Sequence, residues 1–384
     1  MVNGLPPLIA FICGWLLIAS QLPHGISVFD PATFTRWDAS QYLGIASHGY
    51  QLFFHCLQGR PTTLPGLHIC TNTTWFAGYP LLMRAVSATG ISLPVAGLMI
   101  AWVFWYLTLL MIWLLSEPAS DRPASRWGTT ARWLCLLLAA FFPAQIYFAA
   151  LFPISMAAFG MLACCYWSAR VPNWLLAMIA GFIAGSAYLP SVAIIPGLVT
   201  AAVVTKDRCV RRATCLGVGG FAAGVGAVLG YAQLAVGRWD AYFFSERIDY
   251  GIRVHDPIAT IRARFSSFRP LLESAGHRAL AEQALLVALL LVLALAGFAA
   301  SAKTGFQAAD IALIIAAVLV WLIPYIAIPY RPGGMLSVYR DEALTIVLVP
   351  LLRRLPAWLL VPPLLAAVWV AESMASLFFS GYII

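Results

Sequence analysis

Long apolar runs alternate with short polar or Pro/Gly-rich segments along almost the whole chain. A transmembrane helix needs about 20 predominantly apolar residues, and the sequence supplies many runs near this length. The pattern predicts an all-α, polytopic integral membrane protein with about 11 transmembrane helices. The predicted spans are 5–22, 91–116, 133–150, 153–169, 173–188, 190–205, 213–236, 280–301, 306–328, 338–352 and 356–376.

Composition supports a membrane protein and excludes a large soluble core. Of 384 residues, 62% are hydrophobic and 10% are charged, whereas soluble domains carry about 25% charged residues. Residues 5–22 resemble a signal peptide in length, but no basic n-region or small-residue cleavage site accompanies them. We therefore expect a retained first span and one membrane domain over 1–384, without an internal repeat. Glycines between 217 and 230, at small-x-x-x-small spacing, predict close helix packing.

The loops orient the predicted spans. With the N-terminus in the cytoplasm, the basic residues divide almost evenly between the two sides, so their number alone does not decide. Two long segments, 23–78 and 237–279, then lie outside, and long loops translocate largely regardless of charge. The basic clusters at 206–212 and 353–354 fall in short inner loops, where the positive-inside rule applies, and they favour this orientation.

Arginine dominates the basic side chains, since only Lys206 and Lys303 are lysines. A guanidinium binds phosphate or carboxylate through two parallel hydrogen bonds, which an ammonium cannot do. A GC-rich genome accounts for most of this ratio, but not for seven arginines between 237 and 279. We expect internal ion pairs, headgroup contacts and one or two substrate contacts among them. The chain has no nucleic-acid-binding motif, so nucleic acid is not an expected partner.

One acid stands just past the first apolar span. Asp38 follows Arg36 and Trp37, where the chain leaves the bilayer. A carboxylate in that place is positioned for chemistry on a substrate that is itself half in lipid. A solvated loop acid paired with Arg36 is the alternative. Tyr42, His48 and Tyr50 come soon after.

Two of the eight cysteines, Cys56 and Cys70, fall in the first outer loop. The others lie in predicted spans or on the cytoplasmic side. Two thiols alone in an oxidising compartment predict a disulfide. A metal site with His55 and His68 is the alternative, but zinc sites usually have two or more residues between paired ligands. We expect no metal.

Two stretches resemble a known family. Phe34-Thr35-Arg36-Trp37-Asp38-Ala39, then Tyr42-Leu43, Ile45-Ala46 and His48-Gly49-Tyr50, resembles the first lumenal loop of the PIG-V-like mannosyltransferases. These comprise the second mannosyltransferase of glycosylphosphatidylinositol assembly and its bacterial relatives, within the GT-C superfamily. Trp75-Phe76-Ala77-Gly78-Tyr79-Pro80-Leu81-Leu82 resembles the family's Phe-Phe-Pro-x-x-Pro-Leu element. Weaker similarity occurs at Phe142-Pro143-Ala144, Ala180-Gly181-Phe182-Ile183-Ala184-Gly185 and Tyr339-Arg340.

The resemblance implies a GT-C enzyme that takes mannose from a polyprenyl- or dolichyl-phosphate carrier in the lipid bilayer. It implies a glycolipid or lipid-linked acceptor and a site on the extracytoplasmic face of a bacterial plasma membrane, or in the ER of a eukaryote. The family's catalytic acid maps onto Asp38, and its donor-phosphate element maps onto Tyr339 and Arg340. An ordinary interfacial ion pair with Asp341 is the alternative for Arg340. The further substrate-binding candidates are Arg36, Trp37, Gln41, Tyr42, His48 and Tyr50.

The chain also departs from the family pattern. Gln41 stands where relatives often have His, residues 151–155 lack an expected acid, and 188–191 replace a Thr-Arg-x-x-Gly element. One general base, with cations that stabilise the departing phosphate, is sufficient for transfer, and a single acid fits inversion. We expect no cofactor. A lipid-linked-sugar transporter or flippase, or a catalytically silent GT-C homologue, is the alternative, although transporters tend to show internal repeats.

Overall fold

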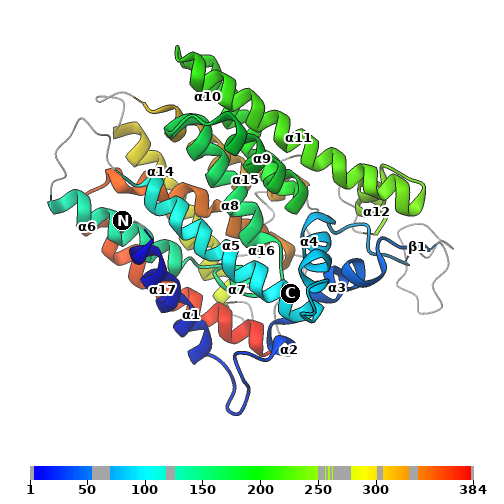
Figure 1. Cartoon of the computed structure of the whole chain (residues 1–384). Helices are drawn as coiled ribbons and strands as arrows, with labels where there is room; N and C mark the ends of the chain where they lie inside the picture. The colour runs from blue at the N-terminus through cyan, green and yellow to red at the C-terminus, as the bar shows by residue number, and fades with distance from the viewer. Residues whose placement is uncertain are drawn as a thin grey trace.

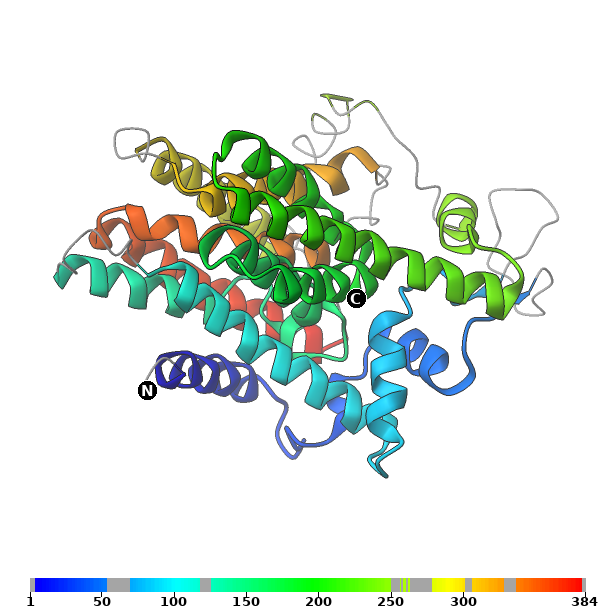
Figure 2. The same ribbon diagram turned by 45° about the horizontal axis from the view of Figure 1, so that its top comes forward.

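The computed structural model describes residues 4–53, 70–117, 126–249, 278–300, 306–327 and 336–381, with the isolated positions 256, 258, 259 and 262. The regular secondary structure of this part of the chain is helical except for one antiparallel pair of two-residue strands, β1 and β2. The long helices pack side by side in a single bundle (Figure 1; Figure 2 shows it tilted). The all-α architecture predicted from the apolar runs is confirmed.

The elements follow in chain order. They are α1 (Leu5–Ser20), α2 (Pro31–Phe34), α3 (Ala39–His48), β1 (Leu52–Phe53), β2 (Cys70–Thr71), α4 (Gly78–Ser87), α5 (Leu93–Leu115), α6 (Arg126–Ala140), α7 (Ile146–Ala149), α8 (Ile154–Cys165), a π-helical turn (Tyr166–Arg170), α9 (Trp174–Ala187), a 3₁₀ turn (Leu189–Ala193), α10 (Ile194–Val204), α11 (Arg208–Val236), α12 (Ala241–Asp249), α14 (Arg278–Ala300), α15 (Ala308–Ala327), α16 (Leu336–Glu342), a 3₁₀ segment (Ala343–Arg354) and α17 (Ala357–Phe379).

Four of the described helices are long and apolar enough to cross a membrane: α5, α11, α14 and α17. Shorter apolar helices, among them α1, α6, α9 and α15, lie beside them. Many large apolar side chains on these helices point outward, including Leu16, Leu234 and Leu365. An outer surface of this kind suits hydrocarbon, where water would disfavour it. The chain is an integral membrane protein.

Every predicted span contains a helix, but two spans are interrupted. The run 133–150 breaks after Ala140, where Pro143 supplies no backbone N–H to continue the helix. The run 338–352 leaves α-helical geometry after Glu342 and continues as a 3₁₀ segment that contains Pro350. Within the predicted outer loops, short helices α3 and α12 form that the hydropathy pattern did not separate from loop.

Helices α9 and α11 meet through small residues. A Cβ atom at Gly181 would overlap the carbonyl oxygen of Gly217, and one at Gly220 would overlap that of Met178. The absence of a side chain at these positions therefore lets two backbones touch. Only one face of the glycine stretch on α11 makes this close contact. A Cβ atom at Gly224 would also overlap the backbone of α9, whereas Gly219, Gly226 and Gly230 face open space.

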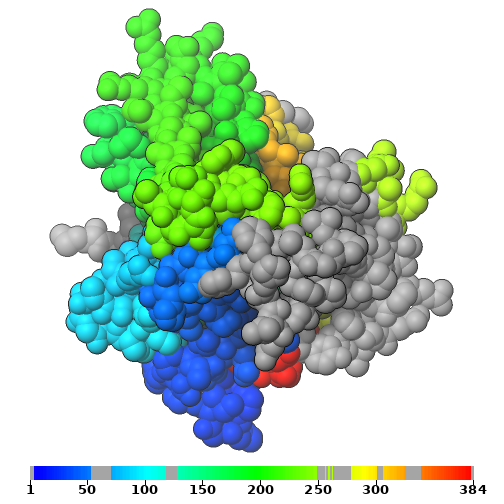
Figure 3. Space-filling view, turned by 90° about the vertical axis from the view of Figure 1, so that its right-hand side faces the viewer, coloured from blue at the N-terminus to red at the C-terminus, as the bar shows by residue number. Residues whose placement is uncertain are grey.

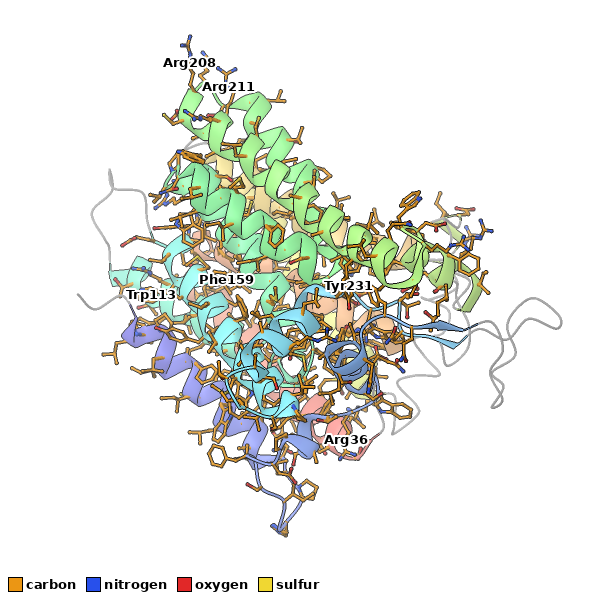
Figure 4. All side chains as sticks on the ribbon, turned by 45° about the vertical axis from the view of Figure 1, so that its right-hand side comes forward. Arg36, Trp113, Phe159, Arg208, Arg211 and Tyr231 are labelled. Atoms are coloured by element: carbon orange, nitrogen blue, oxygen red, sulfur yellow. The ribbon has the colours of Figure 1, made fainter. Side chains whose placement is uncertain are left out.

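The two ends of the bundle carry different elements. The strand pair, α2, α3, α4 and α12 gather at one end (Figure 1), and Figure 3 faces this end. Arg208 and Arg211, in a predicted inner loop, lie at the opposite end from Arg36 (Figure 4). The described parts of both predicted outer loops therefore share one end of the molecule.

A buried ion-pair cluster stabilises the other end. Asp310 on α15 is almost fully buried and pairs with both Arg353, at 2.8 Å, and Arg354. Two cations sharing one buried carboxylate tie α15 to the 3₁₀ segment. The basic pair at 353–354 thus has a structural partner within the fold.

Candidate active site

Asp38 and Arg340 form an ion pair at the end of the bundle that carries α3. Asp38 directly precedes α3, where aspartate usually accepts a hydrogen bond from the first helical N–H groups. Asp30 does so for α2, accepting from the backbone N–H of Ala32 at 3.0 Å. The Asp38 side chain makes no such cap. It accepts instead from Nη1 of Arg340, with the two side chains 18% and 12% exposed.

Aromatic rings surround the guanidinium of Arg340. Its Cζ lies 5.8 Å from the ring centre of Phe152 and 5.9 Å from that of Tyr188, within cation–π range. The Nε atom is buried without a hydrogen-bond partner among the described residues. Because arginine has five N–H donors in a planar fork, the contacts among the described residues leave Arg340 with donors for a second anion.

Asp341 follows Arg340 on α16 and is hydrogen-bonded to a tyrosine. The hydroxyl of Tyr188 donates a hydrogen bond to its carboxylate, which is largely buried. Tyr188 directly follows α9, in the stretch that departs from the family pattern. No sequence signal marked it as part of the site. Arg340 is ion-paired with Asp38, and Asp341 also lies close enough to Arg340 for their charges to interact.

Tyr42 lies under the pair, one turn into α3. Its ring is fully buried and meets Tyr79 and Phe152 edge-on, with ring centres 5.8 and 6.1 Å away. It is close enough to Arg340 and Asp38 for both charges to act on its hydroxyl. Burial raises the pKa of that hydroxyl above its ordinary value, so Tyr42 can serve as a hydrogen-bond donor but not as a base.

Contacts from four parts of the fold fix the segment that carries Asp38. The backbone N–H of Leu151 donates to the Phe34 carbonyl at 3.3 Å, and the Phe34 ring packs edge-on against Trp102 and Phe379. Arg84 on α4 donates to two carbonyls in the last turn of α3, at 2.6 and 3.1 Å. Asp38 is therefore held in place by packed helices, although it follows a loop.

Trp37 has an unusual backbone. Its φ of 45° is in the left-handed region, and among the described residues it is the non-glycine with positive φ. This conformation disfavours bulky side chains and tends to occur where function requires it. The indole is 51% exposed, directly beside Asp38 in the chain.

The other predicted binding residues divide between the site and its supports. Arg36 donates to the carbonyl of Phe379 on α17 at 3.5 Å, so it does not pair with Asp38 here. His48 is exposed, with Nδ1 2.8 Å from the Ser47 hydroxyl. Gln41, on the first turn of α3, is partly buried.

Tyr50 and Tyr339 have structural contacts. The Tyr50 hydroxyl donates to the Trp75 carbonyl at 2.7 Å, within a separate apolar cluster beneath α12. Tyr339 is buried in the main core, and its carbonyl accepts from Gln283 at 2.9 Å. Cys56 lies outside the described residues, as does the side chain of Cys70, so the predicted disulfide stays a prediction.

Glu246 on α12 is a site residue that the sequence did not single out. Its partly buried carboxyl lies close enough to Tyr242, Arg340, Asp341 and Asp38 for these groups to influence its ionisation. Burial is the largest influence and raises the pKa of this carboxyl to about 8. In the sequence it was one of five acids between 237 and 279, with nothing to distinguish it.

Carboxylates are present at the site without a metal-binding arrangement. Among the described residues, no three His, Cys, Asp or Glu side chains group as ligands for a metal ion. In the described part of the chain, the site thus combines an acid, an arginine whose fork is only partly engaged and a second carboxyl, with aromatic rings around them.

Comparison with known proteins yields a structural likeness. No family model and no curated protein matches the sequence. Nine solved chains match the fold, among them the crystal structure of the Archaeoglobus fulgidus oligosaccharyltransferase in complex with zinc and sulfate. The match has a TM-score of 0.48 and 13% sequence identity, and covers 96% of this chain and 53% of that one. This chain therefore spans about half the length of that protein.

Proposed function

We propose that the protein is a GT-C-type mannosyltransferase, which moves mannose from polyprenyl-phosphate-mannose to a glycolipid or lipid-linked acceptor. The observation that carries the proposal is the Asp38–Arg340 ion pair. The PIG-V-like resemblance assigns one of these residues to catalysis and the other to the donor phosphate, from motifs at opposite ends of the chain. Their contact in the fold is what a shared site requires.

The reaction needs a base and a phosphate clamp. An acceptor hydroxyl attacks the anomeric carbon, and the bond from that carbon to the phosphate oxygen breaks with its electron pair. Asp38 takes the hydroxyl proton as general base. Arg340 binds the phosphate through its remaining N–H donors and stabilises the charge that develops on it. A single displacement inverts the anomeric centre, because no covalent sugar–enzyme intermediate forms.

The resting ion pair has a kinetic consequence. Without donor, Arg340 and Asp38 neutralise each other. An arriving phosphate competes with Asp38 for the guanidinium, and so leaves the carboxylate available for the acceptor proton. Donor binding is thus expected to free the Asp38 carboxylate before the acceptor reacts.

The surroundings of the pair suit a lipid-linked sugar. The exposed indole of Trp37 offers an apolar face to the sugar ring or to the lipid chain at the membrane surface. The site lies at the end of the bundle that the charge pattern predicts to be extracytoplasmic, and a carrier's phosphate lies at the same depth as that end of a transmembrane helix.

Purified protein in detergent or nanodiscs tests the proposal. We expect it to move radiolabelled mannose from a short-chain polyprenyl-phosphate-mannose to at least one member of a panel of inositol lipids, other glycolipids and polyprenyl-linked sugars. Absence of transfer to the whole panel, together with movement of the labelled lipid across liposomes, would support a flippase instead.

A further inference from the structure

We infer that Glu246 is a second catalytic carboxyl, which donates a hydrogen bond to the donor's phosphate and stabilises it as the bond to the sugar breaks. The inference rests on the proposed glycosyl transfer and adds a residue to it. It assigns a function to α12, in the second predicted outer loop, that neither the motifs nor the resemblance supplied.

The position of Glu246 is fixed by contacts that residues 241–245, just before it on α12, make with residues 73–76. The Ser245 hydroxyl lies 2.9 Å from the hydroxyl of Thr73, which also lies 3.3 Å from the Ala241 carbonyl. The ring of Tyr242 meets that of Phe76 edge-on, with centres 5.0 Å apart. One face of α12 is thereby held against residues 73–76, so Glu246 stands on an anchored helix.

The charged and titratable groups around Glu246 lie on or next to three helices. Arg340 and Asp341 belong to α16, Asp38 directly precedes α3, and Tyr242 is on α12 itself. Tyr42 on α3 is also within electrostatic range. An ionised Glu246 would face two other carboxylates and would repel an incoming phosphate. Retaining its proton removes that repulsion and provides an O–H donor.

The protonation state at neutral pH follows from the environment. With a pKa raised to about 8, mainly by burial, the Glu246 carboxyl carries its proton below that pH. A phosphate monoester loses its second proton near pH 6. Since Glu246 is the weaker acid, its proton stays on the carboxyl as a hydrogen bond to the departing phosphate. The electron pair of the broken bond goes to the phosphate oxygen, and the acceptor proton goes to Asp38.

The pH dependence of transfer gives a direct test. For the parent protein, kcat/KM with donor should fall about tenfold between pH 7 and pH 9, because it reports the ionisation of essential groups in the free enzyme. Glu246→Gln keeps an N–H donor that does not ionise, so it should remain active and lose this decline. The control Asp240→Asn, in the surface pair with Arg238 just before α12, should keep the parent's profile.

Binding of the product polyprenyl phosphate separates the two proposals. Above pH 7 its phosphate is already a dianion, so a weakening of binding between pH 7 and pH 9 reports on the protein. The parent should show it and Glu246→Gln should not. If this binding pattern appears but no mannose is transferred, the proposed glycosyl transfer is wrong, and the contact between Glu246 and the phosphate is still supported. A decline of equal size in parent and Glu246→Gln, or none in the parent, would overturn the inference.

Discussion

Asp38 and Arg340 stand 302 positions apart in the sequence and share one ion pair in the fold. Both side chains are mostly, but not fully, withdrawn from solvent. A pair in this environment can serve stability or chemistry, because removing one partner leaves the other charge partly desolvated. Substitutions that preserve charge or shape distinguish the two roles.

Arg340→Lys keeps the positive charge and removes the planar fork. A phosphate clamp loses its paired hydrogen bonds, so we expect kcat/KM for the donor to fall about tenfold or more, in line with the 1.5–3 kcal/mol typical of a hydrogen bond to a charged group. The loss should persist at saturating acceptor. The surface variant Arg278→Lys, on α14, is the control. Normal donor kinetics in both Arg340→Lys and Arg340→Ala would place the phosphate elsewhere.

The order of substrate binding should follow from the resting ion pair. If the donor phosphate must first draw Arg340 from Asp38, donor binds before acceptor. A non-reactive acceptor analogue is then expected to inhibit uncompetitively against donor in steady-state transfer assays. Competitive inhibition against donor would show that the acceptor occupies the donor-free enzyme, and that the ion pair does not control access.

Close packing of α9 against α11 should make Gly220 intolerant of a side chain. Its Cβ would overlap the Met178 carbonyl, so Gly220→Val should lower the free energy of unfolding by about 1–3 kcal/mol, as overpacking does. Gly226→Val is the matched control on the same helix, with open space at that Cβ. Thermal unfolding in detergent should show a lower midpoint for the first variant only. Equal midpoints would contradict the packing.

Cys56 and Cys70 are expected to close a disulfide in the first outer loop. The described backbone already pairs Phe53 with Cys70 across β1 and β2, which brings the two ends of that loop together. A closed loop of about 15 residues contributes about 3 kcal/mol in the chain-entropy model. Peptide mapping without reductant should recover the two cysteines linked. Alkylation of both thiols in the native, unreduced protein would rule the bond out.

The helices were predictable from sequence because membrane burial demands long apolar runs, and each run contains a helix. What interrupts those runs was harder to predict. Pro143 ends α6 inside a continuous apolar run. Helix α3 forms in a polar loop, where it is stabilised by the hydrogen bonds from Arg84 and by packing on α4. Tertiary contacts decide such elements.

The site was predictable only where its residues stand in motifs. Asp38 and Arg340 were singled out by local patterns, and the fold brings them into contact. Tyr188 reaches the site from the end of α9, whose position depends on glycine packing against α11. Glu246 reaches it from α12, whose position depends on the Thr73–Ser245 contact. No local pattern encodes such distances. Glu246 is one of several acids in a long loop, and it can be recognised as a site residue only when its neighbours in the fold are known.

The measurement that tests the account most directly is mannose transfer by Asp38→Asn beside Asp30→Asn. Both variants lie in the same segment, and asparagine can still accept the cap that Asp30 provides to α2. Asp38→Asn keeps the size of the side chain but cannot take a proton. Its turnover should therefore fall by the 10²–10⁴-fold typical of a lost general base, while donor binding and the activity of Asp30→Asn remain. Turnover of Asp38→Asn within about threefold of the parent would contradict the assignment of Asp38 as the base.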